Sequence, residues 1–374
     1  MGRLGIPDAV LTHAQRRADA IAARIGELGG RSVRVDAAEI LTGRAALLGL
    51  PAPERVSAGG ASRLLASADG WWALTLSRPD DVDAVPALLE TAEVGPDPWP
   101  ALARASTAAR GADLVARARL LGMPAARLGE CAPGQPTVRP RTAPAGRPLP
   151  SLLVADLSSM WAGPLCGRLL AAAGATVVKV ETPDRPDGTR AGHPGFYNWM
   201  NSEKLSYAVD LDAPELAELL AVADVVIEGS RPAGLARRGL GADQAPARPG
   251  RVWVRITGYG AAHPDRVAFG DDAAVAGGLV TAGRDGPLFC GDAIADPLTG
   301  LQAAGAVLDG LARGGGEVID VAMAVVAATY AALPSDSGVA APPLPPVLPQ
   351  RPARPQGADN AAVRRLVAER RVAC

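Results

Sequence analysis

Aromatic residues, histidine and cysteine are scarce in this chain of 374 residues. Phe, Trp and Tyr together make up 3% of it, so its cores must consist mainly of Ala, Val and Leu. No metal-ligand or CxxC spacing occurs among its histidines and cysteines, which are His13, His193, His263, Cys131, Cys166, Cys290 and Cys374. A zinc site and a disulfide framework are therefore not indicated, and we expect a reduced, cytoplasmic protein that is not exported.

The chain also lacks an excess of charge of either sign, with Lys+Arg 38 and Asp+Glu 39. This balance argues against a nucleic-acid partner held by a broad basic surface. Lysine occurs only at Lys179 and Lys204. The most apolar stretch, residues 318–334, contains Asp320 and is shorter than the ~18 uncharged residues that a membrane span needs. We expect neither a nucleic-acid nor a membrane partner.

Two proline-rich stretches, residues 131–150 and 341–355, divide the sequence. Proline at this density disfavours helix and sheet, so we expect extended connectors. Residues 1–130 combine helical periodicity with the strand-like run WWALTL, which predicts a small α+β domain. Residues 335–374 are expected to form a proline-rich tail with a short C-terminal helix.

Residues 151–334 alternate between continuous apolar runs and helical patterns. The runs are typical of strands buried on both faces and lie at residues 152–157, 176–181, 206–211, 224–228, 252–257 and 318–321. This alternation predicts a Rossmann-like parallel sheet, so the fold class is α/β with a second, smaller α+β domain. Ligands of such sheets bind at the carboxyl ends of the strands.

Residue types alone leave the chemistry open. Residues 158–164, SSMWAGP, follow the first strand and suit either an anion site at a helix N-terminus or an ordinary turn. Asp296 is either a candidate reactive carboxylate or a helix cap. No phosphate-binding loop, dinucleotide fingerprint or GxSxG hydrolase motif is present.

Several consecutive motifs nevertheless resemble those of the family III CoA-transferases, a family that also includes 2-methylacyl-CoA racemases. They occur in the order VADLSSMWAGPLCGRLLAAAGATVVKVE, NSEKLSYAVDL, ADVVIEGSRPAGLARRGLG, VRITGYG and ADPLTG, and they cover nearly all of residues 151–330. The resemblance implies a Rossmann-like CoA-binding catalytic domain over residues 151–334, no permanently bound cofactor, and a homodimer.

The same resemblance implies the reaction. Asp296 of ADPLTG matches the family nucleophile, which attacks an acyl-CoA thioester, forms a mixed anhydride, and then becomes an enzyme-CoA thioester that an acceptor acid resolves. An aspartate with the reference pKa of ~3.9 is ionised at pH 7 without a partner base. Tyr259 of ITGYG matches an active-site aromatic of family members.

The predicted CoA contacts follow the family motifs. They are Ser159, Met160, Trp161, Ala162, Lys179, Arg190, Arg231, Arg237, Gly258 and Gly260. Thr182 and the pair Gly229-Ser230 depart from the family pattern, which motivates a catalytically inactive CoA-binding paralogue as one alternative. A 2-methylacyl-CoA racemase or isomerase is the other alternative, although Gly270 stands where racemases carry a histidine base.

The order of the domains differs from the family. DGWWAL at residues 69–74 and ADLVARARLLGMPAA at residues 112–126 resemble parts of a small domain that follows the catalytic half in family members. Here they come first, so the chain resembles a circularly permuted member whose small domain starts at about residue 56, with residues 131–150 as the new linker. Gly59-Gly60 suits either the family's glycine-rich loop or an ordinary turn.

Overall fold

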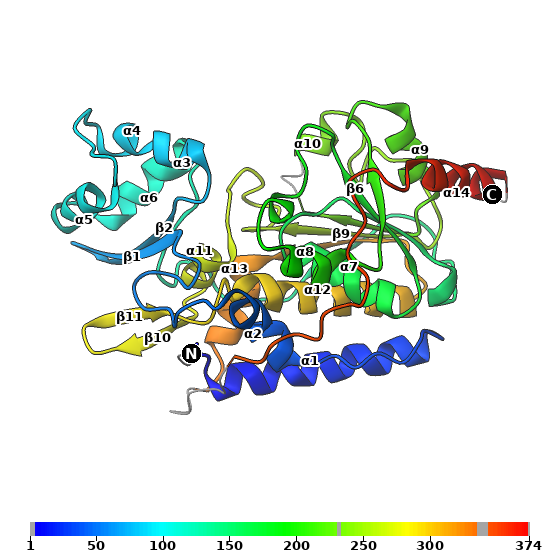
Figure 1. The fold of residues 1–374 in the computed structure, drawn as a ribbon, viewed down its shortest axis with the longest axis horizontal. Coiled ribbons are helices and arrows are strands. Elements are labelled where there is room, and N and C mark those ends of the chain that lie inside the picture. The colour runs from blue at the N-terminus through cyan, green and yellow to red at the C-terminus, as the bar shows by residue number, and fades with distance from the viewer. Residues whose placement is uncertain (1–3, 230–232, 335–342, 373–374) are drawn as a thin grey trace.

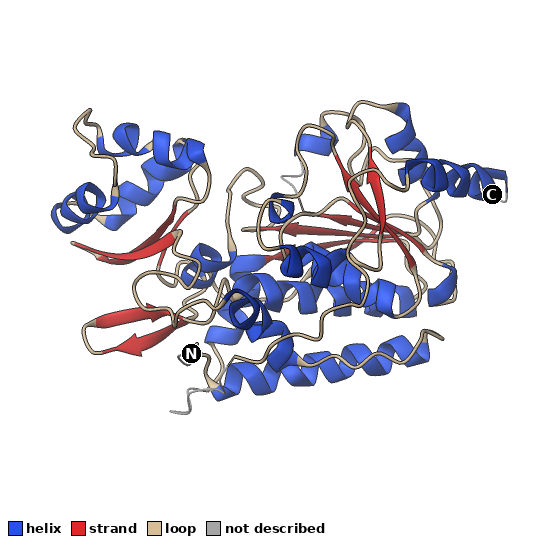
Figure 2. Cartoon of the chain, in the orientation of Figure 1, coloured by secondary structure: helices blue, strands red, loops and turns tan. Residues whose placement is uncertain are grey.

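A seven-stranded, mostly parallel sheet forms the centre of the larger domain in the computed structural model, which describes residues 4–229, 233–334 and 343–372 (Figure 2). The strand order is β4-β12-β9-β8-β5-β6-β7, and only β4 runs antiparallel to its neighbour. The strands are β4 (Thr137–Pro140), β5 (Leu153–Asp156), β6 (Thr176–Glu181), β7 (Leu205–Ala208), β8 (Val225–Glu228), β9 (Val252–Thr257) and β12 (Glu317–Ala322). The predicted Rossmann-like parallel sheet is confirmed.

Helices cover both faces of this sheet because its strands are apolar on both sides. Val154 faces a core shared with the helices α1 (Asp8–Glu27), α2 (Ala37–Leu48), α7 (Ala162–Ala172), α8 (Pro194–Asn201), α12 (Ala295–Ala312) and α13 (Met323–Ala331). Its neighbour Ala155 faces the opposite core, against α9 (Pro214–Val222), α10 (Ala233–Ala236) and α14 (Asn360–Val372). Two short 3₁₀ turns lie beside the next strands in the chain: η1 (Leu149–Ser151) precedes β5, and η2 (Gly188–Arg190) follows β6.

Helix α12 lies between α7 and α1, and 14 of its 18 residues are buried (Figure 1). Small residues allow this close packing: a Cβ atom at Gly300 would lie 2.8 Å from the carbonyl oxygen of Ala162 in α7. The helix ends before Gly314 and Gly315, which adopt φ angles of +95° and +68°. Because α12 is held firmly by this packing, Asp296 in its first turn lies near the carboxyl ends of β5, β8 and β9.

The smaller domain is a three-stranded antiparallel sheet with helices packed on one face. Its elements are β1 (Ser62–Ser67), β2 (Gly70–Thr75), β3 (Ala125–Arg127), α3 (Pro79–Asp83), α4 (Val85–Leu89), α5 (Trp99–Ala108) and α6 (Gly111–Leu120). Trp72 is completely buried in its core and donates a hydrogen bond of 2.8 Å from Nε1 to Ser106 Oγ. The helix α11 (Gly270–Ala276) and the hairpin β10 (Val280–Gly283) and β11 (Gly286–Phe289) join this unit to the larger domain.

The N-terminal boundary of the smaller domain differs from the expected range 1–130. Residues 4–50 do not join its sheet; Val10, Ile21 and Ile25 of α1 are instead buried in the core that contains α7 and α12. Helical periodicity marks the apolar face of α1 but does not say which surface buries it. The two N-terminal helices therefore belong to the catalytic half.

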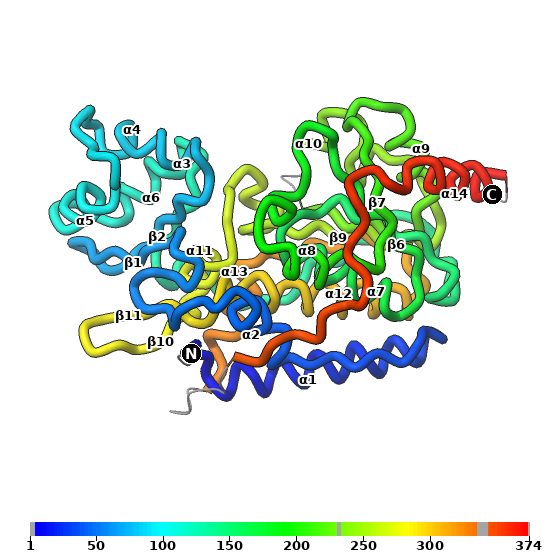
Figure 3. Tube along the Cα trace, viewed as in Figure 1, coloured from blue at the N-terminus to red at the C-terminus, as the bar shows by residue number. Residues whose placement is uncertain are grey.

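The proline-rich segments are more structured than expected. Residues 137–140 form β4 on the edge of the large sheet, where Pro140 can end a strand without leaving a ladder bond unmade. Residues 343–355 run without helix or strand from α2 towards α14 (Figure 3), held by bonds such as Leu344 N–H to Thr42 Oγ1 at 2.8 Å, and residues 356–359 form a turn before α14. None of the helices in the described parts of the chain has the length and apolar character needed to cross a bilayer.

Candidate active site

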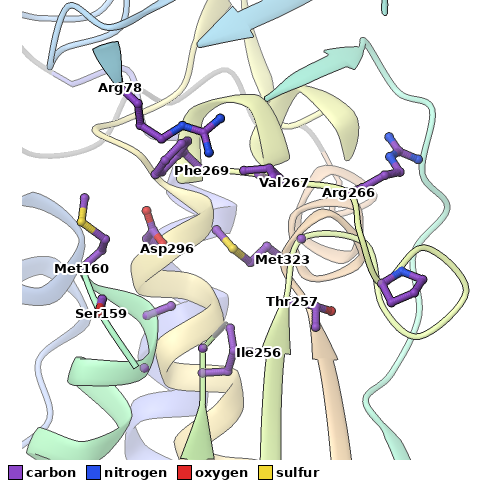
Figure 4. Close-up of a pocket in the computed structure, with 16 residues that line it drawn as sticks. Arg78, Ser159, Met160, Ile256, Thr257, Arg266, Val267, Phe269, Asp296 and Met323 are labelled. Atoms are coloured by element: carbon purple, nitrogen blue, oxygen red, sulfur yellow. The ribbon is translucent and has the colours of Figure 1, made fainter. Parts of the chain in front are cut away.

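Two cavities meet at Asp296. The first cavity, of about 230 Å³, and the second cavity, of about 270 Å³, share three lining residues, Met160, Phe269 and Asp296. Figure 4 shows the carboxylate of Asp296 in the first cavity, between Met160 and Met323. Asp296 thus faces two separate volumes from one position at the start of α12.

The first cavity lies over the carboxyl ends of β5, β8 and β9. Ser159, Gly229 and Thr257 each follow or end one of these strands and line the cavity. Arg78 and Arg266 line its far side, and each pairs with an acid, Asp81 and Glu130 respectively. This position is where a parallel sheet is expected to bind its ligand.

The second cavity lies between α2, the smaller domain and the segment that contains η2 and α8. Its lining residues from these regions are Arg44, Leu48, Gly59, Ala61, Ser62, Thr75, Ser77, Gly188, Thr189, Gly192, His193 and Phe196. Trp161 and residues 270, 271, 292 and 293 complete it. Gly59 thus lines this cavity, although Gly60 also closes an ordinary turn by donating to the carbonyl of Ser57 at 2.8 Å.

Burial raises the pKa of Asp296 to about 7. The nearby carboxyls of Asp271 and Asp292 raise this pKa further, whereas Arg44 and the backbone N–H of Gly270, which donates to the Asp296 carboxylate, lower it. The sequence-based expectation of a fully ionised carboxylate at pH 7 is therefore wrong, because it used the pKa of a solvated aspartate. The ionised form of Asp296, which is the nucleophile, therefore coexists with the protonated form near pH 7.

Two further acids, the partly buried Asp271 and the buried Asp292, lie close to Asp296. Asp271 accepts hydrogen bonds from Ser62 Oγ and from the Ala293 N–H, both at 3.0 Å, and burial raises its pKa. Asp292 accepts Arg44 Nη1 at 2.5 Å, and its other oxygen has no partner among the described residues. Burial raises the pKa of Asp292 to about 6. The described residues contain no group of His, Cys, Asp and Glu arranged to hold a metal ion.

Met160 is held in a strained position that presents the loop after β5 to both cavities. Its φ angle is +73°, and its N–H donates to both carboxylate oxygens of Asp187 at 3.2 Å. Lys179 fixes this arrangement, since its Nζ binds Asp187 Oδ2 at 2.9 Å and also the carbonyl of Ser158. Of the predicted CoA contacts in this loop, Ser159 and Ala162 line the first cavity and Trp161 the second.

The two lysines are structural. Lys179 is 1% exposed and lines neither cavity, which overturns its prediction as a direct CoA contact. Lys204 is 2% exposed; its Nζ donates to Asp156 Oδ2 at 2.8 Å and to Pro164 O and Asn201 Oδ1 at 2.9 Å. Within their motifs, Lys179 and Lys204 therefore stabilise the fold through buried ion pairs with Asp187 and Asp156.

Most of the other predicted CoA contacts lie away from the cavities. Arg190 does not line them, and it is paired with Glu181 at 2.8 Å and 2.6 Å. Arg237 is exposed at the end of α10, and Arg231 lies outside the described residues. Gly258 lines the first cavity, whereas Gly260 does not.

Tyr259 lines neither cavity. It is 6% exposed, its hydroxyl donates to the carbonyl of Ala125 at 3.5 Å, and the Arg266 guanidinium lies 3.4 Å from its ring centroid. Burial raises its pKa above the ordinary value. The aromatic ring between the two cavities is that of Phe269. Neither Phe269 nor Arg44 carries a sequence signal that would have placed it here, because both reach the site through tertiary packing.

Comparisons with known proteins identify the central part of the chain. Residues 149–343 match the model of CoA-transferase family III. The chain is 33% identical over 196 residues to the succinyl-CoA–D-citramalate CoA-transferase of Chloroflexus aurantiacus, covering 47% of this chain and 49% of that one. It is 34% identical over 203 residues to the succinate–glutarate CoA-transferase of Agrobacterium fabrum (47% and 51%), and 37% identical over 182 residues to the succinyl-CoA:glutarate CoA-transferase of Homo sapiens (44% and 42%).

A solved structure of a CAIB/BAIF family protein from Brucella suis is similar over 50% of this chain and 56% of that chain, with 30% identity and a TM-score of 0.45. The chain spans about half the length of the curated relatives it matches.

Proposed function

This chain belongs to CoA-transferase family III, and from that premise we propose that it moves CoA from an acyl-CoA thioester to a carboxylic acid, with Asp296 as the nucleophile. One observation carries the proposal: Asp296 alone supplies a carboxylate to both cavities among the described residues. We assign the CoA arm of the thioester to the first cavity and the acyl group to the second.

The proposed reaction conserves atoms and charge. A carboxylate oxygen of Asp296 attacks the thioester carbonyl, the C–S bond breaks, and CoA thiolate leaves a mixed anhydride on the enzyme. The thiolate then attacks the aspartyl carbonyl and releases the donor acid, which leaves CoA as a thioester on Asp296. The acceptor carboxylate attacks this thioester, and the released thiolate attacks the acyl carbonyl of the new anhydride, giving the product thioester and free Asp296.

The surroundings of Asp296 suit these steps. Burial makes its carboxylate a stronger nucleophile by raising its pKa to about 7, while the Gly270 N–H and Arg44 keep part of it ionised. Enclosure between the two domains limits access of water, which would hydrolyse the anhydride. No histidine base is needed, because the ionised fraction of Asp296 attacks directly as an anion.

The predicted CoA contacts that line the first cavity, Ser159, Met160, Ala162 and Gly258, remain in the proposal. Arg266 and Arg78 are added as cations facing the same volume. The names of the relatives pair succinyl-CoA or succinate with citramalate or glutarate, so short acids of this kind are the first substrates to test.

Steady-state transfer assays test the proposal. Wild-type protein should transfer CoA between short acyl-CoA thioesters and acids with ping-pong kinetics, and Asp296→Asn should lose at least about 1,000-fold in kcat. Asp309→Asn, at a partly exposed position near the C-terminal end of the same helix, is the matched control and should retain activity. CoA binding without transfer to any acid would favour the inactive paralogue.

The racemase alternative receives no support from the geometry. A Cβ atom at Gly270 would lie 2.3 Å from the carbonyl oxygen of Ala293 and 2.6 Å from Asp296 Oδ2, so the position of the racemase histidine is filled. Exchange of the substrate α-proton should therefore be absent. Its detection without CoA transfer would overturn this assignment.

We also propose that the enzyme is a cytoplasmic homodimer and that its small domain, residues 56–130, is circularly permuted. The separate hydrophobic core of that domain, built around Trp72, supports the proposed circular permutation. Light scattering should report a mass of two chains. A variant with residues 56–130 moved behind residue 334 should fold and transfer CoA.

A further inference from the structure

The guanidinium of Arg44 is only partly used by the protein. Its Nη1 donates to Asp292 at 2.5 Å, while Nε and Nη2 make no hydrogen bond with any described residue. The side chain is 24% exposed and lines the second cavity. Gly59 leaves Nη2 room, since even a Cβ atom there would be 3.8 Å away. Two charged donor groups therefore remain open to a ligand.

A second donor, on a residue that lines the same cavity, is buried and also lacks an acceptor. Trp161 is 3% exposed, lines the second cavity, and its Nε1–H has no hydrogen-bond partner among the described residues. The Arg44 Cζ atom lies 5.7 Å from the Trp161 ring and 5.5 Å from the Phe196 ring. Buried donors usually have partners, so a ligand acceptor beside Arg44 would complete this group.

We propose that Arg44, with Trp161, is the specificity-determining group of the second cavity and binds the remote carboxylate of a short dicarboxylic acyl group. The inference rests on the proposed function for its orientation, with the reacting carbonyl at Asp296. A carboxylate accepts hydrogen bonds in the forked pattern that a guanidinium offers, and an alkyl end would leave these donors unpaired.

The surrounding charges place the remote carboxylate on the Arg44 side. Asp271 and Asp296 are acids that line the same cavity, and Asp292 already accepts Arg44 Nη1. Asp296 is uncharged while it is acylated or bound to CoA, which removes one repulsive charge when the acyl group is seated. His193 also lines this cavity, and its Nδ1 accepts the Gly195 N–H at 3.1 Å. Leu48, Phe196 and Phe269 give the connecting methylene groups an apolar wall.

The first test measures single-turnover labelling of Asp296 by succinyl-CoA and by butyryl-CoA, which matches it in chain length and lacks only the terminal carboxylate. Wild type should prefer succinyl-CoA by about 10- to 150-fold, the range for a hydrogen bond to a charged group. Arg44→Gln should abolish the preference and change butyryl-CoA labelling only a few-fold. Arg44→Lys should restore part of it, and Trp161→Phe should reduce it.

The matched control is Arg17→Gln, because Arg17 has a similar exposed fraction, 23%, and also pairs with an aspartate, but lies on α1 away from both cavities. It should keep the wild-type preference. A merely structural role of Arg44 would slow both thioesters equally, so an unchanged ratio in Arg44→Gln would overturn the proposal.

A binding measurement separates this inference from the proposed function. Calorimetry should show that free glutarate binds wild type more tightly than valerate, and that Arg44→Gln removes the difference. This result supports the Arg44 site even if no thioester labels Asp296, in which case the proposed transfer fails by itself. Equal binding of the two acids to wild type would refute the Arg44 site and leave the transfer proposal intact.

Discussion

Gly270 offers a sharp test of how the nucleophile is positioned. It is the first residue of α11, and its backbone N–H donates to the carboxylate of Asp296. In Gly270→Ala the new Cβ would lie 2.3 Å from the Ala293 carbonyl oxygen and 2.6 Å from Asp296 Oδ2. The Ala293 carbonyl oxygen belongs to the backbone, and Ala293 already has a strained φ of +43°, so moving it away from the new Cβ costs free energy.

The cost follows from these overlaps. Overpacking of this kind typically destabilises a protein by about 1–3 kcal/mol. Relief of the overlap must move the first turn of α12, and a displacement of about 1 Å at a reacting group lowers rates by roughly 100-fold. Gly270→Ala should therefore reduce kcat/KM for CoA transfer far more than its loss of stability would suggest.

The measurement pairs kcat/KM with the free energy of unfolding from denaturant titration. Gly26→Ala is the matched control, because a Cβ there meets nothing within 4 Å in α1. It should leave kcat/KM unchanged and stabilise the protein by up to about 1 kcal/mol. If Gly270→Ala kept kcat/KM within threefold of wild type, the described contact between α11 and Asp296 would be refuted.

Three further predictions concern buried charges. Transfer rates should rise with pH through an apparent pKa of about 7, because Asp296 attacks only when it is ionised. Asp271→Asn should move this rise to lower pH, because the Asp271 carboxyl raises the pKa of Asp296. A flat pH–rate profile between about pH 5 and 8 would contradict this. Lys204→Met should lower the free energy of unfolding by about 3–5 kcal/mol by leaving Asp156 buried without its partner, with no change in the KM for acyl-CoA; a raised KM at unchanged stability would speak for ligand contact instead. Burial raises the pKa of Asp272 to about 8, so between about pH 4 and 8 folding takes up a proton and the folded state loses stability as the pH rises. Melting curves should therefore show that the melting temperature of Asp272→Asn rises relative to that of wild type over this interval. A difference in melting temperature that does not change with pH would contradict the raised pKa.

The sheet could be predicted from the sequence because each of its parallel strands is a short apolar run. Val154 and Ala155 face opposite cores, so the run shows no alternation. The place of Asp296 after such runs also follows, since the carboxyl ends of parallel strands meet at one edge. In the sequence, Asp296 is recognisable as the acid of the ADPLTG motif at the start of a helix.

The rest of the site is built from residues that are far apart in the sequence, and local sequence patterns do not reveal such contacts. Arg44 reaches Asp292 across 248 positions, and nothing in the helix around it distinguishes it from a surface arginine. Lys179 and Tyr259 show the converse, since their motifs are compatible with either ligand contact or burial. Only packing decides this, and it buries both residues.

The pKa of Asp296 shows the same limit. Residue type gives the value for a solvated carboxyl, whereas the value of about 7 follows from burial and from two acids that the fold brings close. The charge state of the nucleophile is thus a property of the tertiary structure.

The central claim is that Asp296 becomes covalently attached during turnover. Wild type mixed with excess acyl-CoA, quenched and measured by mass spectrometry, should carry an adduct with the mass of CoA less one water. The adduct should map to the first turn of α12 and be released by hydroxylamine, and Asp296→Asn should form none. An adduct on another residue, or CoA transfer by Asp296→Asn at the wild-type rate, would contradict the account.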